Sequence, residues 1–489
     1  MKAEQSYPRL DPRLTAAVEP TPVMNPQWIA FNDELAEQLA IPAAQRASDD
    51  GLQIFSGNQV PDWAQPHALA YAGHQFANYV PQLGDGRAVL LTEVIGNDGR
   101  RYDIQLKGSG RTPYSRGGDG RSPIGPVLRE YLLSEAMHRL GVPTTRALAA
   151  VATGELVQRE EALPGAILTR VAASHLRVGT AQYVLAFKER DLLKKFADYV
   201  IDRHYPHCAN AEDPYLALLE AVIDRQAQLI AQWMSLGFIH GVMNTDNMTL
   251  SGETIDYGPC AFMEAYDPAT VFSFIDRRGR YAYQNQPGIG VWNLARFAET
   301  LLPLIQVGAD DTDDAKGAIK QATAAIEQFQ QIYEGYYWQR MTAKIGLPGA
   351  DADAKVLTQD YLELMQQQQV DFTLAFRLLG DSDPKRLADL FGNSQAWQDW
   401  HQRWQQAITA EDASMSSAQT KLNRINPAYI PRNHLVEAAI EEAVQEGSLA
   451  LFNQLNEVLR TPFVEQDNAG DFFQPATPEQ AVPRTFCGT

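Results

Sequence analysis

The sequence predicts an α+β protein in which a β-rich front half precedes a mostly helical back half. Two β-rich runs, "RAVLLTEV" and "RRYDIQLK", are separated by "GNDG", which is a strong hairpin signal. An apolar stripe at helical spacing follows in "PVLREYLLSEAMHRLG". From Trp292 to about Phe452 the pattern is mostly helical. This order of elements matches a two-lobed layout.

Local patterns predict the further elements. The helix after the hairpin has Pro126 in its first turn and is closed by Gly141 and Pro143. The runs "TTRALAAVAT" and "GAILTRVA" predict two more strands, and helices are expected over about 191–204 and 214–236. The segments "FIHGVM" and "NMTLSGETIDYG" are expected to form short strands around a tight turn at "SGE".

The pattern divides the chain into four segments. Residues 1–65 are rich in proline and turn residues, which predicts an irregular N-terminal arm packed on the core. Residues 66–190 hold most of the predicted strands, and residues 191–460 hold most of the predicted helices. Residues 461–489 form a polar tail that contains Cys487.

The composition is that of an ordinary globular protein, with 45% hydrophobic and 21% charged residues among 489. No run of about 18 apolar residues is present, so we expect no membrane span. The start "MKAEQSYPRLDPRL" lacks the apolar core of a signal peptide, and three cysteines are too few for a disulfide framework, so we expect a cytoplasmic protein. The net charge of −19 argues against a nucleic-acid partner, because phosphate neutralisation needs a basic surface.

The stretch "FIHGVMNTDNMTL", residues 238–250, is the first candidate for chemistry. His240 and Asn247 keep the spacing of the kinase catalytic loop, H-R-D-x-x-x-x-N. Val242 occupies the position of the kinase base, and a carboxylate appears only later in the loop, at Asp246. The loop therefore predicts a kinase-like site whose proton acceptor has moved.

Four further features occur in an order typical of nucleotide-dependent phosphotransferases. "LGDGR" holds two glycines before a strand, Lys107 ends the next strand, Glu130 lies in the following helix, and "TIDYGP" holds Asp256. Each has an ordinary explanation by itself, such as a turn, a solvated lysine or a helix-dipole partner. The ordered set favours a nucleotide site in which Glu130 fixes Lys107 and Lys107 reaches phosphates.

A metal site is expected beside these features. Asn247 and Asp256 offer an amide oxygen and a carboxylate oxygen, which phosphates and water can complete. Such ligands suit Mg²⁺ or Mn²⁺ rather than zinc.

Over most of its length the chain resembles the selenoprotein O family, which are protein adenylyltransferases with a pseudokinase fold. The resemblance is carried by "LAYAGHQFANYVPQLGDGRA", "DIQLKGSGRTPYSRGGDGRS", "GVMNTDNMTLSGETIDYGP" and "NQPGIGVWNLARFAETL". It implies a bilobal protein-kinase-like fold, with residues 66–190 as the N-lobe and 191–460 as the C-lobe. It also implies that ATP binds in a reversed orientation. AMP would then pass to Ser, Thr or Tyr hydroxyls of proteins, the enzyme itself included.

The resemblance implies roles for individual residues. Asp246 would be the proton acceptor, and Glu130 would position Lys107. Asn247 and Asp256 would bind the metal. The residues that would contact ATP are Gly84, Gly86, Arg87, Lys107, Asp119, Gly120, Arg170, Arg177 and Asp256.

The resemblance also implies redox sensitivity through a residue near the C-terminus. That residue is selenocysteine in eukaryotic members and Cys487 here. Cys260, just after "DYGP", is one candidate for a disulfide partner, and Cys208 lies near a predicted helix end. The alternative is a free exposed thiol in the tail.

Two other functions stay open. A kinase that acts on a protein or a small molecule would use a similar nucleotide site, although Val242 at the base position counts against it. A nucleotide-binding pseudokinase scaffold is the other alternative. The retained Lys107, Asn247 and Asp256 count against the scaffold, because a scaffold does not need a complete metal site.

Overall fold

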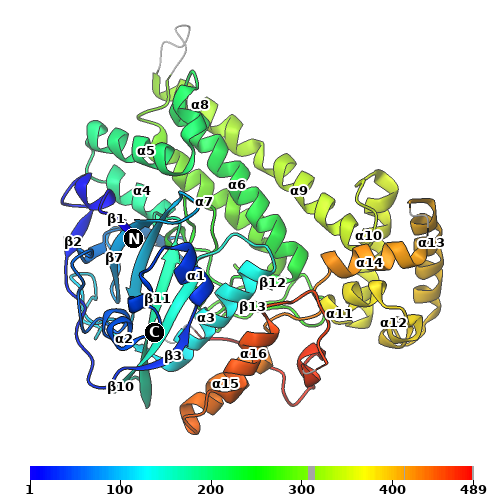
Figure 1. Ribbon diagram of the computed structural model, residues 1–489. Coiled ribbons are helices and arrows are strands. Elements are labelled where there is room, and N and C mark those ends of the chain that lie inside the picture. The colour runs from blue at the N-terminus through cyan, green and yellow to red at the C-terminus, as the bar shows by residue number, and fades with distance from the viewer. Residues whose placement is uncertain (307–313, 412–413, 468, 487–489) are drawn as a thin grey trace.

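The computed structural model describes residues 1–306, 314–411, 414–467 and 469–486, and it combines one large antiparallel sheet with a helical back half (Figure 1). The strands are β1 (Lys2–Glu4), β2 (Thr15–Ala17), β3 (Gln27–Phe31), β4 (His67–Leu69), β5 (Gly73–Gln75), β6 (Asn78–Val80), β7 (Ala88–Ile95), β8 (Arg101–Lys107), β9 (Ser122–Pro123), β10 (Arg146–Gln158), β11 (Ala162–Ala172), β12 (Phe238–Ile239) and β13 (Ala261–Phe262). The large sheet has the order β2-β4-β7-β8-β11-β10-β3, with β1 paired to β7 and β9 to β11. The predicted combination of a β-rich front half and a helical back half is confirmed.

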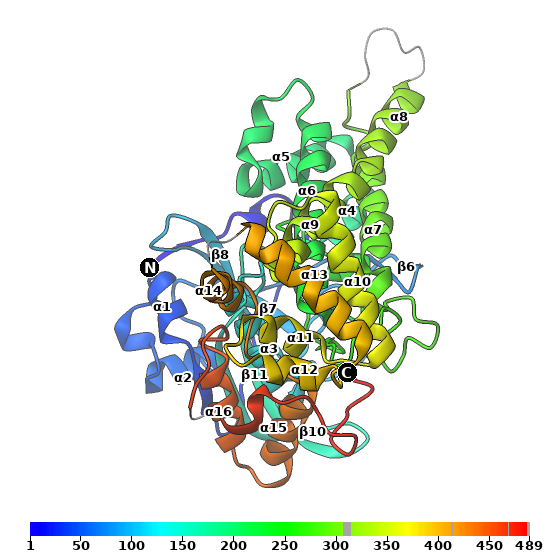
Figure 2. The ribbon, with the colours of Figure 1, turned by 90° about the vertical axis from the view of Figure 1, so that its right-hand side faces the viewer.

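The helices follow the sheet in sequence for the most part. They are α1 (Asp33–Gln38), α2 (Asp49–Phe55), α3 (Ile124–Arg139), α4 (Val178–Leu185), α5 (Arg190–His204), α6 (Pro214–Leu236), α7 (Gln286–Leu301), α8 (Asp314–Glu327), α9 (Phe329–Lys344), α10 (Ala352–Gln368), α11 (Phe372–Arg377), α12 (Pro384–Leu390), α13 (Gln395–Glu411), α14 (Met415–Ile425), α15 (Asn433–Gln445) and α16 (Ala450–Val458). Figure 1 shows α6 and α9 in contact and α10–α14 gathered on the side away from the sheet. Figure 2 shows α15 and α16 next to α3. Within the described ranges, no helix has the length and apolar content to cross a bilayer.

The predicted hairpin is confirmed, and its register places candidate site residues on interior strands of the sheet. β7 and β8 pair from Ala88 opposite Lys107 to Ile95 opposite Arg101, on either side of "GNDG". The next strand, β11, sets Arg170 directly opposite Gln105. The sheet therefore presents Lys107 and Arg170 on adjacent strands, each of which is fixed by backbone hydrogen bonds.

The predicted helix after the hairpin is confirmed as α3. It packs between the sheet, where it contacts β10 and β11, and α15 on its other side. Because both faces are covered, even Arg129, Glu130 and Glu135 are buried. The helix thus carries a carboxylate, that of Glu130, into the protein interior above β8.

The strands predicted from "TTRALAAVAT" and "GAILTRVA" are confirmed as β10 and β11, and the helices expected over 191–204 and 214–236 are confirmed as α5 and α6. α6 begins where the side chain of Asp213 accepts hydrogen bonds from the N–H groups of Tyr215 and Leu216. It ends at Gly237, whose φ of 71° is the left-handed conformation usual after a helix.

The expectation of an irregular arm over residues 1–65 is wrong. These residues contribute β1, β2 and β3 to the large sheet, as well as α1 and α2. Edge strands and short added strands satisfy backbone groups that would otherwise be left unpaired. The three strands have only three to five residues each, which is too short for an alternating pattern to stand out among the prolines.

The expected strand over "NMTLSGETIDYG" does not form. β12 pairs with β13 instead, and residues Thr245–Asn247 form a 3-10 turn. The hydroxyl of Thr249 accepts a hydrogen bond from the N–H of Glu253 at 2.9 Å, which favours a turn over a ladder. Asp256 then turns the chain with a φ of +61°. Local side-chain chemistry therefore overrides the β propensity of this segment.

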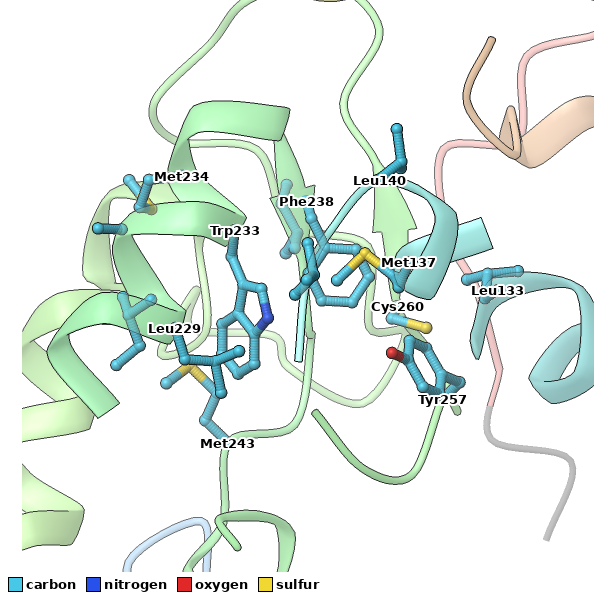
Figure 3. Close-up of a cluster of buried hydrophobic side chains, with 14 of the residues drawn as sticks. Leu133, Met137, Leu140, Leu229, Trp233, Met234, Phe238, Met243, Tyr257 and Cys260 are labelled. Atoms are coloured by element: carbon cyan, nitrogen blue, oxygen red, sulfur yellow. The ribbon is translucent and has the colours of Figure 1, made fainter. Parts of the chain in front are cut away.

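A cluster of buried apolar side chains packs around β12 and the loop that follows Asp256 (Figure 3). Met137 from α3, Trp233 from α6 and Phe238 from β12 meet there, together with Tyr257 and Cys260 from the following loop. The Phe238 ring centroid lies 5.7 Å from that of Trp233 and 6.1 Å from that of Tyr257. The cluster joins the helix that carries Glu130 to the loop that carries Asp256.

Lys344 is an unusual buried cation at the end of α9. Its ammonium lies 4.5 Å from the ring centroid of Phe376 and 5.7 Å from that of Phe372. No carboxylate pairs with it in the described part of the chain. Burial lowers the pKa of Lys344 from 10.5 to about 7.

We expect Lys344→Met to make the free energy of unfolding less dependent on pH. Between about 7 and 10.5 the unfolded lysine binds a proton that the folded lysine has lost, so the parent gains stability as pH rises through this range. The variant should melt at a higher temperature than the parent near neutral pH, with a smaller difference at alkaline pH. Thermal melts across the pH range measure this. A variant that melts below the parent at neutral pH would show that the ammonium stabilises the fold.

Candidate active site

A cavity of about 640 Å³ opens between the large sheet and the loops after β12. Residues from both sides line it, including Val242 from the kinase-like loop. Every residue that the sequence analysis assigned to ATP, metal or proton transfer lines it as well: Gly84, Gly86, Arg87, Lys107, Asp119, Gly120, Glu130, Arg170, Arg177, Asp246, Asn247 and Asp256. Residues spread over more than 170 positions of the sequence thus come together in one place.

A network of ion pairs forms one wall of the cavity. The Nζ of Lys107 lies 2.6 Å from Oε2 of Glu130 and 2.8 Å from Oδ1 of Asp256. Nη1 of Arg170 lies 2.6 Å from the same Oδ1 and 3.2 Å from Oε1 of Glu130. The pairing of Lys107 with Glu130 that the sequence predicts is therefore present, and Asp256 joins the same network.

Arg177 extends the network from the residue just before α4. Its Nη1 lies 3.3 Å from Oδ2 of Asp256 and donates to the backbone oxygen of Asp246 at 2.9 Å. Its guanidinium lies over the ring of Tyr71, 4.5 Å from the centroid, and its Nη2 is 3.9 Å from Oδ1 of the buried Asp85. Arg177 therefore connects the two acidic residues of the loops.

Asp256 holds a strained backbone conformation at the centre of this network. Its φ of +61° is unfavourable for a residue with a side chain, at a cost on the order of 1–2 kcal/mol. Burial alone would raise the pKa of Asp256, but Lys107, Arg170 and Arg177 together hold it well below its usual value. The carboxylate is thus ionised at any physiological pH.

The glycines assigned to the nucleotide loops lie where a side chain does not fit. A Cβ on Gly84 would lie 2.4 Å from the ring of Tyr114, and one on Gly120 would lie 2.0 Å from the backbone oxygen of Gly110. Both have positive φ, 72° and 71°. Bare backbone at these points can approach a ligand closely.

Asp119 and Arg87 contribute from the same loops. The carboxylate of Asp119 accepts from the guanidinium of Arg159 at 2.8 Å and from the N–H of Arg121 at 2.9 Å. The Arg159 pair lowers the pKa of Asp119. The backbone oxygen of Arg87 accepts from the N–H of Gly108 at 2.7 Å, which joins the start of β7 to the end of β8.

The kinase-like loop is held to the "DYG" segment by His240. Nε2 of this buried histidine donates to the backbone oxygen of Ile255 at 2.9 Å, and Nδ1 accepts from the N–H of Val242 at 3.4 Å. Burial lowers the pKa of His240, so the ring is neutral. Nδ2 of Asn247 donates to the backbone oxygen of Val242 at 3.0 Å, which fixes the orientation of its amide.

Asp246 has an environment unlike that of Asp256. Its side chain is buried, and Oδ1 has no hydrogen-bond partner among the described residues. Oδ2 accepts one long hydrogen bond, 3.4 Å, from Nε2 of Gln75. Burial raises the pKa of Asp246 to about 6. A carboxylate with a raised pKa in a residue that lines a cavity is suited to accept a proton.

The β5–β6 hairpin lies over the loop that carries Asp246, and this contact was not foreseen from the sequence. The N–H of His74 donates to Oγ1 of Thr245 at 2.7 Å, and the N–H of Phe76 donates to Oδ1 of Asn244 at 3.0 Å. A Cβ on Gly73 would lie 2.5 Å from Oδ1 of Asp246. The hairpin thus fixes the loop from one side.

Other residues that line or support the cavity also went unassigned. Gln105 accepts from Nη2 of Arg170 at 2.7 Å and donates to Oδ2 of Asp85 at 2.8 Å. The ring of Tyr71 supports Arg177. Asp85 and Tyr71 belong to a stretch that carries the family resemblance, so the sequence did mark this region. Their individual roles could not be predicted, because the residues that they contact are distant in the sequence.

Neither Cys208 nor Cys260 lines this cavity. Cys260 and Cys208 are both buried. Cys487 lies outside the described residues, so its pairing with Cys260 or with another cysteine stays a prediction.

Comparison with known proteins identifies the family. A model of the family described as "Protein adenylyltransferase SelO" matches residues 2–460. The chain belongs to the SelO family. It is 53% identical to a protein named "Protein nucleotidyltransferase YdiU" from Rhizobium johnstonii, over 99% of this chain and 97% of the relative. It is 51% and 52% identical to proteins of the same name from Bradyrhizobium diazoefficiens and Rhodopseudomonas palustris, over 99% of each chain.

Membership of the SelO family makes the protein an enzyme, a nucleotidyltransferase. The cavity has features that such chemistry uses. Cations on its wall can stabilise the negative charge of phosphates, and glycines allow the backbone to approach a ligand closely. A carboxylate that can accept a proton also lines it. These features make the cavity the candidate site for that chemistry.

We expect Gly73→Ala to reduce nucleotidyl transfer roughly 10²-fold while nucleotide binding persists. The added methyl would displace the carboxylate of Asp246, and small misplacements of reacting groups have effects of this size. Gly335→Ala on α9 is a matched control, because no heavy atom lies within 4 Å of a Cβ there. Initial rates and nucleotide titrations separate the two effects. Parental rates in Gly73→Ala would show that the hairpin does not position Asp246.

Proposed function

We propose that the protein transfers AMP from ATP to Ser, Thr or Tyr hydroxyls of proteins, itself among them. In this reaction the hydroxyl oxygen bonds to the α-phosphorus, and the bond from that phosphorus to the bridging oxygen of pyrophosphate breaks. Pyrophosphate leaves, and the hydroxyl proton passes to Asp246. The observation that carries the proposal is the buried carboxylate of Asp246, which lines the cavity in a loop where Val242 replaces the kinase base.

The position of Asp246 supports a reversed nucleotide. In kinases the base faces the γ-phosphate from the position that Val242 occupies here. The carboxylate now lies four residues later, so the reacting phosphorus is expected at a shifted place too. A reversed ATP would bring its α-phosphorus there. We also interpret the sheet and the helical half as the two lobes of a kinase-like fold.

The charged wall supports a polyphosphate ligand. Lys107, Arg170 and Arg177 converge on the cavity, where they pair with Glu130, Asp256 and, at 3.9 Å, Asp85. The phosphates of ATP would take over these cations as partners. The guanidinium groups of Arg170 and Arg177 suit this task, because their planar fork matches phosphate oxygens.

Mg²⁺ or Mn²⁺ fits the same site. Asn247 and Asp256 would hold the ion through oxygen atoms, as hard cations prefer. Among the described residues no three His, Cys, Asp or Glu side chains could hold a metal together, so phosphates would complete the ligand set. When bound, the ion would neutralise charge on the phosphates. The neutral amide of Asn247, fixed by the backbone oxygen of Val242, presents its own oxygen in a set direction.

The expected setting is the cytoplasm, with proteins rather than nucleic acids or membranes as partners. The net charge of −19 would repel a phosphate backbone over most of the surface. A reducing compartment also suits Cys208, which is a buried thiol.

The first test uses ATP labelled on one phosphate at a time. Label from the α-phosphate should appear on protein, the enzyme included, because AMP is the transferred group. Label from the γ-phosphate should not appear. A gel after incubation with Mg²⁺ or Mn²⁺ shows both. Transfer of γ-label without α-label would establish the kinase alternative, and absence of both labels would favour a scaffold.

The second test separates the proton acceptor from the metal ligand. Asp246→Asn should lower the rate of transfer about 10²–10⁴-fold and leave ATP binding intact, because only the proton acceptor is lost. Asn247→Ala should instead raise the metal concentration needed for half-maximal rate. Asp202→Asn, which removes an exposed carboxylate on α5, is the control. Loss of ATP binding in Asp246→Asn would assign this carboxylate to the ligand site instead.

A further inference from the structure

A second depression adjoins the cavity. It encloses about 750 Å³ and shares two lining residues, Phe76 and Ile275, with the cavity. Its other lining residues come from the segment after β13 and from the start of α7. We name it the acceptor groove, and define it by Phe76, Ile275, Arg277, Arg278, Arg280 and Gln284. A chain bound in this groove would reach the cavity without a gap.

The acceptor groove is basic, although the protein as a whole carries a net charge of −19. Arg277 and Arg278 are exposed, and within the described ranges neither side chain forms an ion pair. Asp276 supplies the one carboxylate among the described residues that line the groove, and this carboxylate already accepts hydrogen bonds from the backbone. It accepts from the N–H groups of Arg280 at 3.0 Å and Tyr281 at 2.7 Å. The turn therefore holds its arginines in place without neutralising them.

Apolar side chains lie beside these arginines. Phe274 is 41% exposed and Ile275 is 58% exposed, which is unusual for adjacent large hydrophobic residues. Phe486 from the tail lies against Phe274 with ring centroids 4.6 Å apart and also lines the cavity. Two apolar residues, Phe274 and Ile275, thus come shortly before Arg277 and Arg278 in one short segment. Such a surface fits a ligand that is acidic and carries an apolar side chain.

The acceptor groove is connected to Asp246 through hydrogen bonds. The hydroxyl of Tyr281 donates to Oδ1 of Asn244 at 2.6 Å, and the N–H of Phe76 donates to the same oxygen at 3.0 Å. The rings of Phe76 and Tyr281 pack edge to face, with centroids 5.1 Å apart. Asn244 lies two residues before Asp246. The groove wall is therefore attached to the loop that carries the proton acceptor.

We propose that the acceptor groove binds the protein segment that receives AMP, and that it selects segments with acidic residues and one apolar residue near the hydroxyl. The proposal rests on the proposed function for the identity of the cavity as the transfer site. Arg277 and Arg278 pair with the acidic side chains, and Ile275 contacts the apolar one. In an acidic protein, a local cationic surface also steers such segments toward the site and turns away basic ones.

The test measures binding separately from transfer. A fluorescein-labelled peptide with one tyrosine between glutamates and a leucine is titrated with the full chain, and its partner peptide has lysines in place of the glutamates. The parent should bind the acidic peptide, and affinity should fall as salt rises. Arg277→Glu and Arg278→Glu should each weaken this binding about 3- to 10-fold and improve binding of the lysine peptide.

The matched control is Arg424→Glu on α14, which makes the same charge change on an exposed arginine outside the groove. Equal weakening in this control, or unchanged binding in Arg277→Glu and Arg278→Glu, would overturn the acceptor groove. So would binding of an oligouridylate in place of the acidic peptide. Transfer of α-label to the acidic peptide is measured in parallel. Binding that depends on Arg277 without any transfer would count against the proposed function and leave the groove in place.

Discussion

The ion pairs of Asp256 are the interaction on which the rest of the site depends. This one carboxylate joins Lys107 at the end of β8, Arg170 in β11 and Arg177 before α4, so it connects the sheet to the loops of the helical half. Burying such charges costs several kcal/mol per ion before their attraction is counted, and the positive φ of Asp256 adds strain. A cavity wall of apolar side chains would cost less free energy to bury. The free-energy cost of such a network supports the proposed polyphosphate site, in which Glu130 and Asp256 would hold the three cations in place before the nucleotide binds.

The two acidic residues of the loops differ in protonation because their surroundings differ. Asp256 faces three cations, which hold its pKa well below the usual value. For Asp246 burial outweighs the effect of Arg177 and raises the pKa to about 6. One carboxylate thus stays ionised for charge stabilisation, and the other can exchange a proton near neutral pH. This division of roles between two nearby carboxylates follows from environment alone. The β5–β6 hairpin contributes to it, because Gly73 lets the backbone approach Asp246 and keep water away from one side.

The parts of the fold that follow short-range rules could be predicted from the sequence. The β7–β8 hairpin, α3 and α6 have strong turn, cap or periodic signals, and the Lys107–Glu130 pair follows from their order. β1, β2 and β3 could not be predicted, because each is short and is stabilised by pairing with a distant strand. The same reason hid Gly73, Asp85 and Gln105, whose importance depends on neighbours that are far away in sequence. The false strand over "NMTLSGETIDYG" is instructive, since hydrogen bonds from Thr249 and the turn at Asp256 override a pattern that β propensity favours.

Under the proposed function, the nucleotide and the acidic acceptor segment bind to arginines in different states of pairing. Inside the cavity the cations are already paired with carboxylates, so a nucleotide must replace those partners, and only a ligand with dense charge can do so at little net cost. In the acceptor groove Arg277 and Arg278 are exposed and form no ion pair within the described chain. An acidic segment therefore displaces no carboxylate partner when it binds them, and each contact adds little affinity. The first arrangement favours selectivity for a polyphosphate, and the second favours fast, reversible association with many related segments. A transferase that binds one small substrate and several protein acceptors needs both properties side by side, and the shared Phe76 and Ile275 are where the two surfaces meet.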